Sequence, residues 1–294
     1  MSTYLPQKCG IATYTDYLTR ALRKVNPHLG IKIIAEKGAK PLKQNNFQVV
    51  TPWHRNEDYV SQILTNTDDI DILHIQHEYG IYGFNFQILP LFENLNPKIK
   101  SIITIHCIRP SQIALPERGD IEERLVKKMA QHADRVIVHL ENQKRILERL
   151  GISHDKISVV PHGTEFADID KGIARHKLNL PKDKKIILML GFIKRHKKVH
   201  IAIDSLSELL KEDEDIVLFL AGRLPINPRE VDVKYFQSLQ QKILDFQPRN
   251  NIIFPNRFFP NEDVPYLLRA ADVVLFPYIE DSRAASGVLH LAIG

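Results

Sequence analysis

The feature that most constrains the fold is the alternation of short β-rich apolar runs with segments of helical periodicity. The β-rich runs cover residues 31–35, 47–50, 70–76, 100–106, 135–139 and 157–160. After the polar stretch "PHGTEFADIDKGIARHKLNLPKDK", a second series follows at 185–190, 216–221, 251–254 and 273–276. Apolar residues between the runs recur at helical spacing, as in Ile11, Tyr14, Leu18 and Leu22. This alternation predicts two α/β halves with parallel sheets.

The two series predict a domain at residues 1–165, a linker at 166–183 and a second domain at 184–294. The segment "CGIATYTDYLTRAL" opens with a glycine turn of the kind that follows a first strand, yet only "MSTYLPQK" precedes it. We therefore expect the first strand to be missing or reduced to a stub. We also expect the second domain to be incomplete, because the chain stops at "SGVLHLAIG" after four strands.

Composition excludes several classes of protein. No apolar run approaches the roughly 18 residues of a membrane span, and the N-terminus lacks a signal-peptide core, so the expected location is cytoplasmic. Cys9 and Cys107 are too few for a disulfide framework or a zinc site. The formal net charge of +5 favours anionic small molecules and leaves peripheral membrane contact open. No nucleic-acid-binding motif accompanies it.

A cluster of basic side chains lies in "GFIKRHKKVHIAIDSL", between a predicted strand and a predicted helix. The turn at residues 194–198 would present its cations beside a helix N-terminus, where backbone N–H groups already favour anions. The helix dipole alone contributes only ~0.3–1 kcal/mol. Charge-assisted bonds from Arg195 or Lys197 would therefore supply most of the affinity for a diphosphate. The alternative is a basic turn that only faces solvent.

Four stretches together resemble the retaining GT-B glycosyltransferases that include glycogen synthases and many bacterial mannosyl- and glucosyltransferases. These stretches are "STYLPQKCGIATYTDYLTRAL", "VVPHGTEF", "GFIKRHKKVHIAIDSL" and "PNEDVPYLLRAADVVLFPYIEDSRAASGVLHLA". The resemblance implies two facing Rossmann-like domains with a cleft between them. It also implies transfer of a hexose, with retention, from a nucleotide-sugar held by the second domain to a sugar or glycan on the first. No cofactor and no metal are expected.

The resemblance carries donor-binding roles to seven residues: Gly10, Arg195, Lys197, Lys198, Ser286, Gly287 and Val288. Two departures affect the basic turn. Phe192 and Lys198 stand where the family turn usually has Arg and Gly. The paired glutamates of the family fall at Ala284 and Ala292, and Glu280 lies four residues too early to replace the first.

Polar residues at two predicted strand ends indicate the acceptor side. His106, in "TIHCIRP", matches the cleft histidine of the family and is the predicted catalytic residue. The second strand end, "HIQHEYG", supplies the predicted acceptor-binding residues Gln76, His77, Glu78 and Tyr79. An ordinary polar loop and a structural histidine remain the alternatives. His74 and His77 are not expected to form a metal pair, because they face opposite sides of a strand.

His162 and Gly163 are interpreted as a hinge turn, for which glycine supplies torsional freedom. An alternative function from another class is a GT-B module that binds a glycan, nucleotide or protein without turnover, which the missing glutamates favour. A nucleotide-sugar epimerase ranks last because no acid/base carboxylate pair is evident. Neither a Gly-x-Ser-x-Gly elbow nor a Cys-His arrangement indicates a nucleophilic hydrolase.

Overall fold

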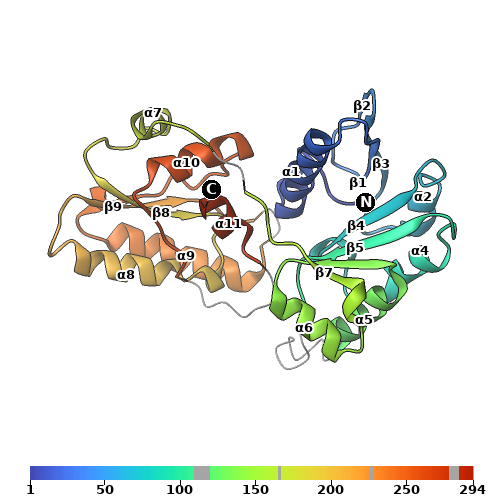
Figure 1. Ribbon diagram of the computed structural model, residues 1–294. Coiled ribbons are helices and arrows are strands. Elements are labelled where there is room, and N and C mark those ends of the chain that lie inside the picture. The colour runs from blue at the N-terminus through green and yellow to red at the C-terminus, as the bar shows by residue number, and fades with distance from the viewer. Residues whose placement is uncertain (109–119, 165–166, 226–227, 278–284, 294) are drawn as a thin grey trace. The chain divides into compact units, whose positions relative to one another are not determined.

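The computed structural model describes residues 1–108, 120–164, 167–225, 228–277 and 285–293 (Figure 1). The chain forms two compact units, of which the first runs from Met1 to His162 and the second begins at Gly163. Each unit contains a sheet whose strands are mostly parallel. The prediction of two Rossmann-like α/β domains is therefore confirmed.

The first unit contains two sheets that an extended N-terminal segment joins. Its strands are β1 (Ile31–Glu36), β2 (Leu42–Gln44), β3 (Phe47–Trp53), β4 (Ile72–His77), β5 (Lys100–Ile105), β6 (Arg135–Val138) and β7 (Ile157–Val159). They pair in the orders β1-β3-β2 and β4-β5-β6-β7. Ser2 N donates to Ile34 O at 3.2 Å, and Gln76 N donates to Met1 O at 3.1 Å. Residues 1–3 thus lie between β1 and β4 as the short first strand that the sequence predicted.

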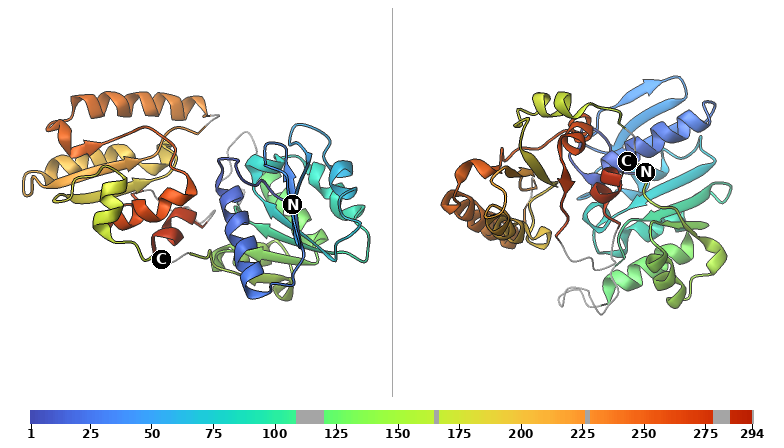
Figure 2. Two further views of the ribbon diagram at one scale, coloured as in Figure 1. Left: turned by 90° about the horizontal axis from the view of Figure 1, so that it is seen from above. Right: turned by 60° about the vertical axis from the view of Figure 1, so that its left-hand side comes forward.

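The helices of the first unit lie on both faces of its sheets. They are α1 (Gly10–Val25), α2 (Val60–Leu64), α3 (Tyr79–Tyr82), α4 (Leu89–Glu93), α5 (Ile121–His132) and α6 (Glu141–Arg149). In Figures 1 and 2, α1 lies on one face and α2, α4 and α5 lie on the other. Cys9 Sγ accepts from Ala12 N at 3.4 Å and so caps α1. The buried face of α1 carries only Ala12, Thr15 and Thr19, small side chains that allow close approach to the sheet.

The core of the first unit explains why its central strands read as apolar runs. β4 and β5 are buried over their last residues on both faces, as expected for parallel strands covered by helices. Trp53, Tyr59 and Tyr82 form an aromatic cluster in which the rings of Trp53 and Tyr82 stack at 5.5 Å between centroids. This cluster packs beside the end of β4, since the ring of His77 stacks on Tyr82 at 5.8 Å.

The second unit has a four-stranded parallel sheet with helices on both faces. Its elements are α7 (Lys171–Lys177), β8 (Lys185–Leu190), α8 (Val199–Leu209), β9 (Ile216–Ala221), α9 (Glu230–Asp245), β10 (Ile252–Ile253), α10 (Val264–Ala270), β11 (Val273–Val274) and α11 (Gly287–Ile293). The strand order is β10-β9-β8-β11. Figures 1 and 2 show α8 and α9 on one face of the sheet and α7 and α10 on the other.

The predicted linker at residues 166–183 differs from the structure. Asp170 caps α7, since Asp170 Oδ1 accepts from Ile173 N at 3.0 Å, and Ala174 belongs to the core of the second unit. The guanidinium of Arg175, which is buried, donates to Ala270 O and to Asp272. These contacts make the segment part of the second unit, and the division falls at His162–Gly163. The polar surface of such a short helix concealed it in the sequence.

Every helix in the described part of the chain is too short or too polar to cross a membrane.

Candidate functional site

The topology of the second sheet selects one edge for ligand binding. From β8 the chain moves outward through β9 to β10, then crosses to β11 on the other side of β8. The carboxyl ends of β8 and β11 therefore form a topological switch point. In open α/β sheets, ligands bind outside the strand ends at such a point.

The turn that leaves β8 needs two glycines. Gly191 has φ +113°, a conformation that side chains rarely adopt. A Cβ on Gly222, which follows β9, would lie 2.0 Å from the Gly191 carbonyl oxygen. Ile193 N donates to Arg223 O at 2.8 Å and so continues the contact between the two turns. The close approach of the two backbones fixes the start of the basic turn.

The basic turn brings several cations to this switch point. Residues Arg195–Lys197 form a 3₁₀ turn, Lys198 has left-handed φ +54°, and α8 begins at Val199. The half-buried Lys197 has its pKa lowered to about 8 by burial and by the neighbouring charge of Lys194. A bound anion would offset both effects.

Asp232 on α9 holds the turn in place and was not predicted from the sequence. Its buried carboxylate accepts from Arg195 N at 3.2 Å and from Arg229 Nε at 2.9 Å. Burial raises the pKa of Asp232, but these hydrogen bonds outweigh that effect and leave the pKa below its usual value. Nothing in the sequence distinguishes this carboxylate from other helix-surface acids.

The segment at residues 286–288 lies beside the same turn. Val288 Cγ2 is 3.8 Å from the position that a Cβ on Gly191 would occupy. Ser286 Oγ accepts from Leu289 N at 3.3 Å, and Gly287 begins α11. The structure thus places Val288 beside the glycine from which the basic turn begins, and the donor-binding role of residues 286–288 stays a prediction. Gly10 belongs to the first unit, as the first residue of α1, and a Cβ there would meet nothing within 4 Å.

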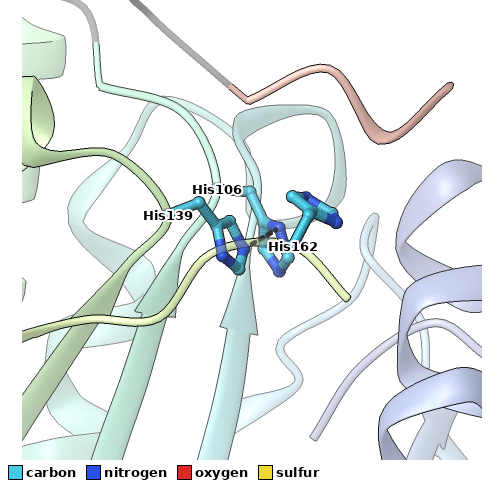
Figure 3. A group of neighbouring side chains, drawn as sticks. All are labelled: His106, His139 and His162. Atoms are coloured by element: carbon cyan, nitrogen blue, oxygen red, sulfur yellow. Dashed lines mark hydrogen bonds between the residues drawn. The ribbon is translucent and has the colours of Figure 1, made fainter. Parts of the chain in front are cut away.

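Histidines mark the carboxyl edge of the first sheet. His77 ends β4, His106 and His139 directly follow β5 and β6, and His162 lies three residues after β7. Because these four strands are neighbours in that order, their carboxyl ends meet along one edge. His106, His139 and His162 cluster there, each with a ring nitrogen within 4.8 Å of the other two (Figure 3). The ring of Tyr14 packs edge-on against all three.

Both ring nitrogens of His106 lie close to polar atoms of the first unit. Nε2 lies 2.9 Å from Gln76 Oε1, and Nδ1 lies 3.1 Å from His139 Nε2. Burial, followed by the neighbouring histidines His139 and His162, lowers the pKa of His106 well below its ordinary value. His106 is therefore a neutral imidazole, and its catalytic role stays a prediction.

The predicted acceptor residues differ in their access to solvent. The side chains of Gln76, His77 and Tyr79 are buried, so an acceptor would reach only the partly exposed Glu78 directly. Burial lowers the pKa of His77 to about 3. Glu78 Oε2 itself accepts from Gly80 N at 2.6 Å at the start of α3. Residues at a strand end can point into the core, and the sequence alone did not show which of these four do so.

Comparison with known proteins identifies the family. Residues 9–168 match the profile of Glycosyltransferase Family 4, and residues 170–284 match that of Glycosyl transferases group 1. The chain belongs to glycosyltransferase family 4. In this family 4 chain, the boundary between the two matches coincides closely with the boundary between the two units.

Curated relatives of the family 4 chain carry names that refer to different compounds. Alpha-monoglucosyldiacylglycerol synthase of Streptococcus pneumoniae is 22% identical over 99% of this chain and 68% of that protein. D-inositol 3-phosphate glycosyltransferase of Nocardia farcinica is 24% identical over 63% of this chain and 42% of that protein. The chain thus spans about two fifths to two thirds of the length of these two relatives.

Solved structures show that the fold is that of the GT-B glycosyltransferases. An alpha,alpha-trehalose-phosphate synthase (UDP-forming) from Burkholderia vietnamiensis has a TM-score of 0.69 at 13% identity, covering 98% of this chain and 77% of the other. HepE of Anabaena in complex with UDP-glucose has a TM-score of 0.59 at 16% identity, covering 79% and 60%.

Two of the residues that depart from the family pattern lie in described parts of the structure. Lys198, where the family resemblance implies a glycine, has a left-handed φ of +54°. Ala292, at the position of the second family glutamate, lies in α11. Ala284 and Glu280 fall outside the described residues.

His139 is the residue of the first edge that the sequence interpretation missed. The signal was the recurrence of a histidine at successive strand ends, in "TIH", "IVH" and "VVPH". The interpretation that no metal pair forms considered only His74 and His77, and His162 was interpreted as part of a hinge. The boundary between the units does fall at His162–Gly163, and the structure also places His162 beside His139, with ring centroids 4.2 Å apart.

Proposed function

We propose that this chain moves a hexose, of the mannose or glucose type, from a nucleotide-sugar to a sugar or glycan acceptor, with retention at the transferred carbon. The observation that carries the proposal is the basic turn at the switch point of the second sheet. There Lys197 lies half-buried beside the start of α8. The solved relatives that hold UDP or UDP-glucose support a nucleotide diphosphate as the group bound at this turn.

The chemistry follows from the charge of the turn. The glycosidic bond to the diphosphate breaks as negative charge develops on the leaving oxygen, and the cations of residues 194–198 stabilise that charge. The same oxygen takes the proton of the acceptor hydroxyl on the same face of the sugar, and the acceptor oxygen forms the new bond to the anomeric carbon. The first unit supplies the acceptor side, where we assign the partly exposed Glu78 to acceptor binding and the buried, neutral His106 to the catalytic role that the family resemblance implies.

The names of two relatives bear on the class of acceptor. One relative is named for a glycosylated diacylglycerol and another for an inositol phosphate. A lipid acceptor would require contact with a membrane surface, which the formal net charge of +5 would favour where that surface is anionic.

Calorimetric titration of the chain with UDP, GDP and ADP tests the donor site. Lys197→Ala removes a charged hydrogen-bond donor, which corresponds to ~1.5–3 kcal/mol or roughly a tenfold to hundredfold loss of affinity. Lys211→Ala is the matched control, because Lys211 is an exposed lysine of the same unit paired with Glu208. Equal affinities in the parent and in Lys197→Ala would mean that the basic turn only faces solvent.

Binding without turnover is the second candidate, because alanine stands at both positions of the family glutamates. Glycosyl transfer and binding without turnover can be distinguished by one assay. The chain is incubated with nucleotide-sugars and simple acceptors, and nucleoside diphosphate release is measured. Release that depends on acceptor supports transfer. Tight nucleotide binding with no release under any donor and acceptor pair supports the binding module.

A further inference from the structure

The histidine cluster at the edge of the first sheet has a hydrogen-bond pattern that a metal ion would complete. His139 Nδ1 lies 2.8 Å from Val160 O, which can only accept. In the neutral ring, Nδ1 therefore carries the hydrogen and Nε2 presents its lone pair. That lone pair faces His106 Nδ1 at 3.1 Å.

The partner of His106 on its other side fixes its tautomer in the same way. His106 Nε2 lies 2.9 Å from Gln76 Oε1, and Gln76 Nε2 lies 3.2 Å from His74 Nε2. With the amide in this orientation, Gln76 accepts from His106 Nε2 and donates to His74. His106 Nδ1 then also presents a lone pair, and two lone pairs point at each other across 3.1 Å.

We propose that His106, His139 and His162 bind one divalent transition-metal ion of the zinc type. Two nitrogens that bind Zn²⁺ tetrahedrally at about 2.0–2.1 Å lie roughly 3.3 Å apart, close to the separation of His106 Nδ1 and His139 Nε2. Outer-nitrogen bonds from ligand histidines to carbonyl oxygens, as to Gln76 and Val160 here, are the usual support of a metal site. Three imidazoles suit Zn²⁺ and its neighbours, and they leave a fourth position for water or another oxygen ligand.

His162 completes the ligand set by a small movement. The three ring nitrogens lie within 4.8 Å of one another, so the widest pair must approach by about 1.5 Å to reach tetrahedral spacing. His162 is partly exposed and follows a three-residue strand, whereas the other two rings are buried. Rotation of this ring is therefore the adjustment that binding requires.

The backbone around the cluster is held independently of any metal. Gln143 Oε1 accepts from His139 N at 2.9 Å, and Gln143 Nε2 donates to His106 O at 3.3 Å. Gln143 is fully buried and thus ties the end of β5 to the end of β6. The first two ligands are positioned before the ion arrives, as a binding site needs. This inference does not rest on the proposed glycosyl transfer, and an ion held through His106 Nδ1 would withdraw His106 from the role assigned to it there.

Zinc binding to the chelator-treated 294-residue chain is the test. Competition with a chromophoric chelator gives affinity, and elemental analysis after desalting gives stoichiometry. We expect one Zn²⁺ per chain, a higher Tm with Zn²⁺, and visible absorption of tetrahedral Co²⁺ on substitution. Gln76→Ala should weaken binding by about 10- to 100-fold through the outer contact.

His162→Ala and His139→Gln should each abolish tight binding. His154→Ala is the matched control, because this exposed histidine of the same unit pairs with Glu148 at 2.7 Å. His162→Ala is the decisive variant, since its partly exposed position makes misfolding less of a concern, and circular dichroism checks its fold. The proposal is overturned if the parent binds no Zn²⁺ or if His162→Ala binds it like the parent. It is also overturned if ¹⁵N NMR with Zn²⁺ present shows His106 Nδ1 donating a hydrogen to His139.

Discussion

The carboxyl edges of the two sheets are built from opposite chemistry. The first edge carries a histidine at four neighbouring strand ends, and burial lowers the pKa of His77 and His106 so that both rings stay neutral. The second edge carries a cluster of lysines and arginines, of which Lys197 keeps an ammonium pKa of about 8. Neutral imidazoles offer lone pairs, and ammonium groups offer charge. The same α/β architecture thus presents one edge suited to metals and hydroxyls and another suited to phosphates.

The two edges also differ in what fixes their backbones. Side-chain bonds from Gln143 tie the first edge, whereas a close approach between Gly191 and Gly222 fixes the second. The second edge should therefore be the more sensitive to a single added methyl group.

Gly222→Ala is predicted to have the largest effect. The new Cβ would lie 2.0 Å from the Gly191 carbonyl oxygen, so the second unit should lose about 3 kcal/mol or more of stability. Urea unfolding followed by circular dichroism measures the loss, and Gly163→Ala, where a Cβ would meet nothing within 4 Å, is the control. Trp53 is the single tryptophan and lies in the first unit. If the unfolding midpoint followed by Trp53 fluorescence decreased as much as the midpoint followed by circular dichroism, the effect would not be confined to the second unit.

Acid should weaken the first unit through His77. Its pKa is lowered by burial from 6.5 to about 3, so the unfolded chain binds more protons between these values. Stability is then complete above pH 6.5 and falls as the pH decreases, by about 2 kcal/mol at pH 5 from this residue alone. His74, lowered to about 4, acts in the same direction.

His77→Phe should remove this part of the pH dependence while keeping the ring stacked on Tyr82. Urea unfolding followed by Trp53 fluorescence at pH 5 and 7.5, with a chelator present, measures the difference. The parent should lose more stability than the variant on going to pH 5. Parallel losses in the two proteins would show that His77 is not responsible.

The apolar strands were predictable because branched apolar runs bounded by polar segments have few other interpretations. All ten predicted strands exist, although β10 and β11 are shorter than predicted. β2 was missed because its residues, Leu42–Gln44, are all exposed and show no alternation. α7 was missed because most of its surface is polar. Local patterns identify elements that bury side chains and miss those that remain at the surface.

The candidate site was predictable only where a motif carries its own chemistry. The basic turn follows from a glycine, a run of cations and a helix, all adjacent in sequence. Asp232 and His139 reach their sites through tertiary structure, from a later helix and a neighbouring strand. The sequence also predicted site residues that the structure buries. These are the strand-end residues Gln76, His77 and Tyr79, which form part of the core.

The affinity of the second edge for a diphosphate should depend on pH through Lys197. Its pKa of about 8 in the free protein should rise when a diphosphate binds, because the anion stabilises the ammonium form. Affinity should be constant from pH 7 to 7.5 and then decrease, approaching tenfold per pH unit above pH 8. Titration with UDP from pH 7 to 9.5 tests this, and Lys197→Ala should show a flatter profile. A profile as steep in the variant as in the parent would assign the titration to another group.

The smallest effect is expected from Lys198→Gly. Lys198 has φ +54°, and a left-handed conformation costs a residue with a Cβ ~1–2 kcal/mol. Glycine removes that cost but gains about 0.5–1 kcal/mol of conformational entropy in the unfolded chain. The net gain in stability should therefore be about 0.5–1 kcal/mol, measured by urea unfolding of the second unit. Lys198→Ala is the matched control, because it removes the charge and keeps the strained backbone, so it should show no gain. Equal stability of the two variants would mean that backbone strain at this turn is absent, whereas a gain only with glycine would explain why the family usually has glycine there. Any loss of UDP affinity shared by both variants would then report the contribution of the Lys198 charge alone.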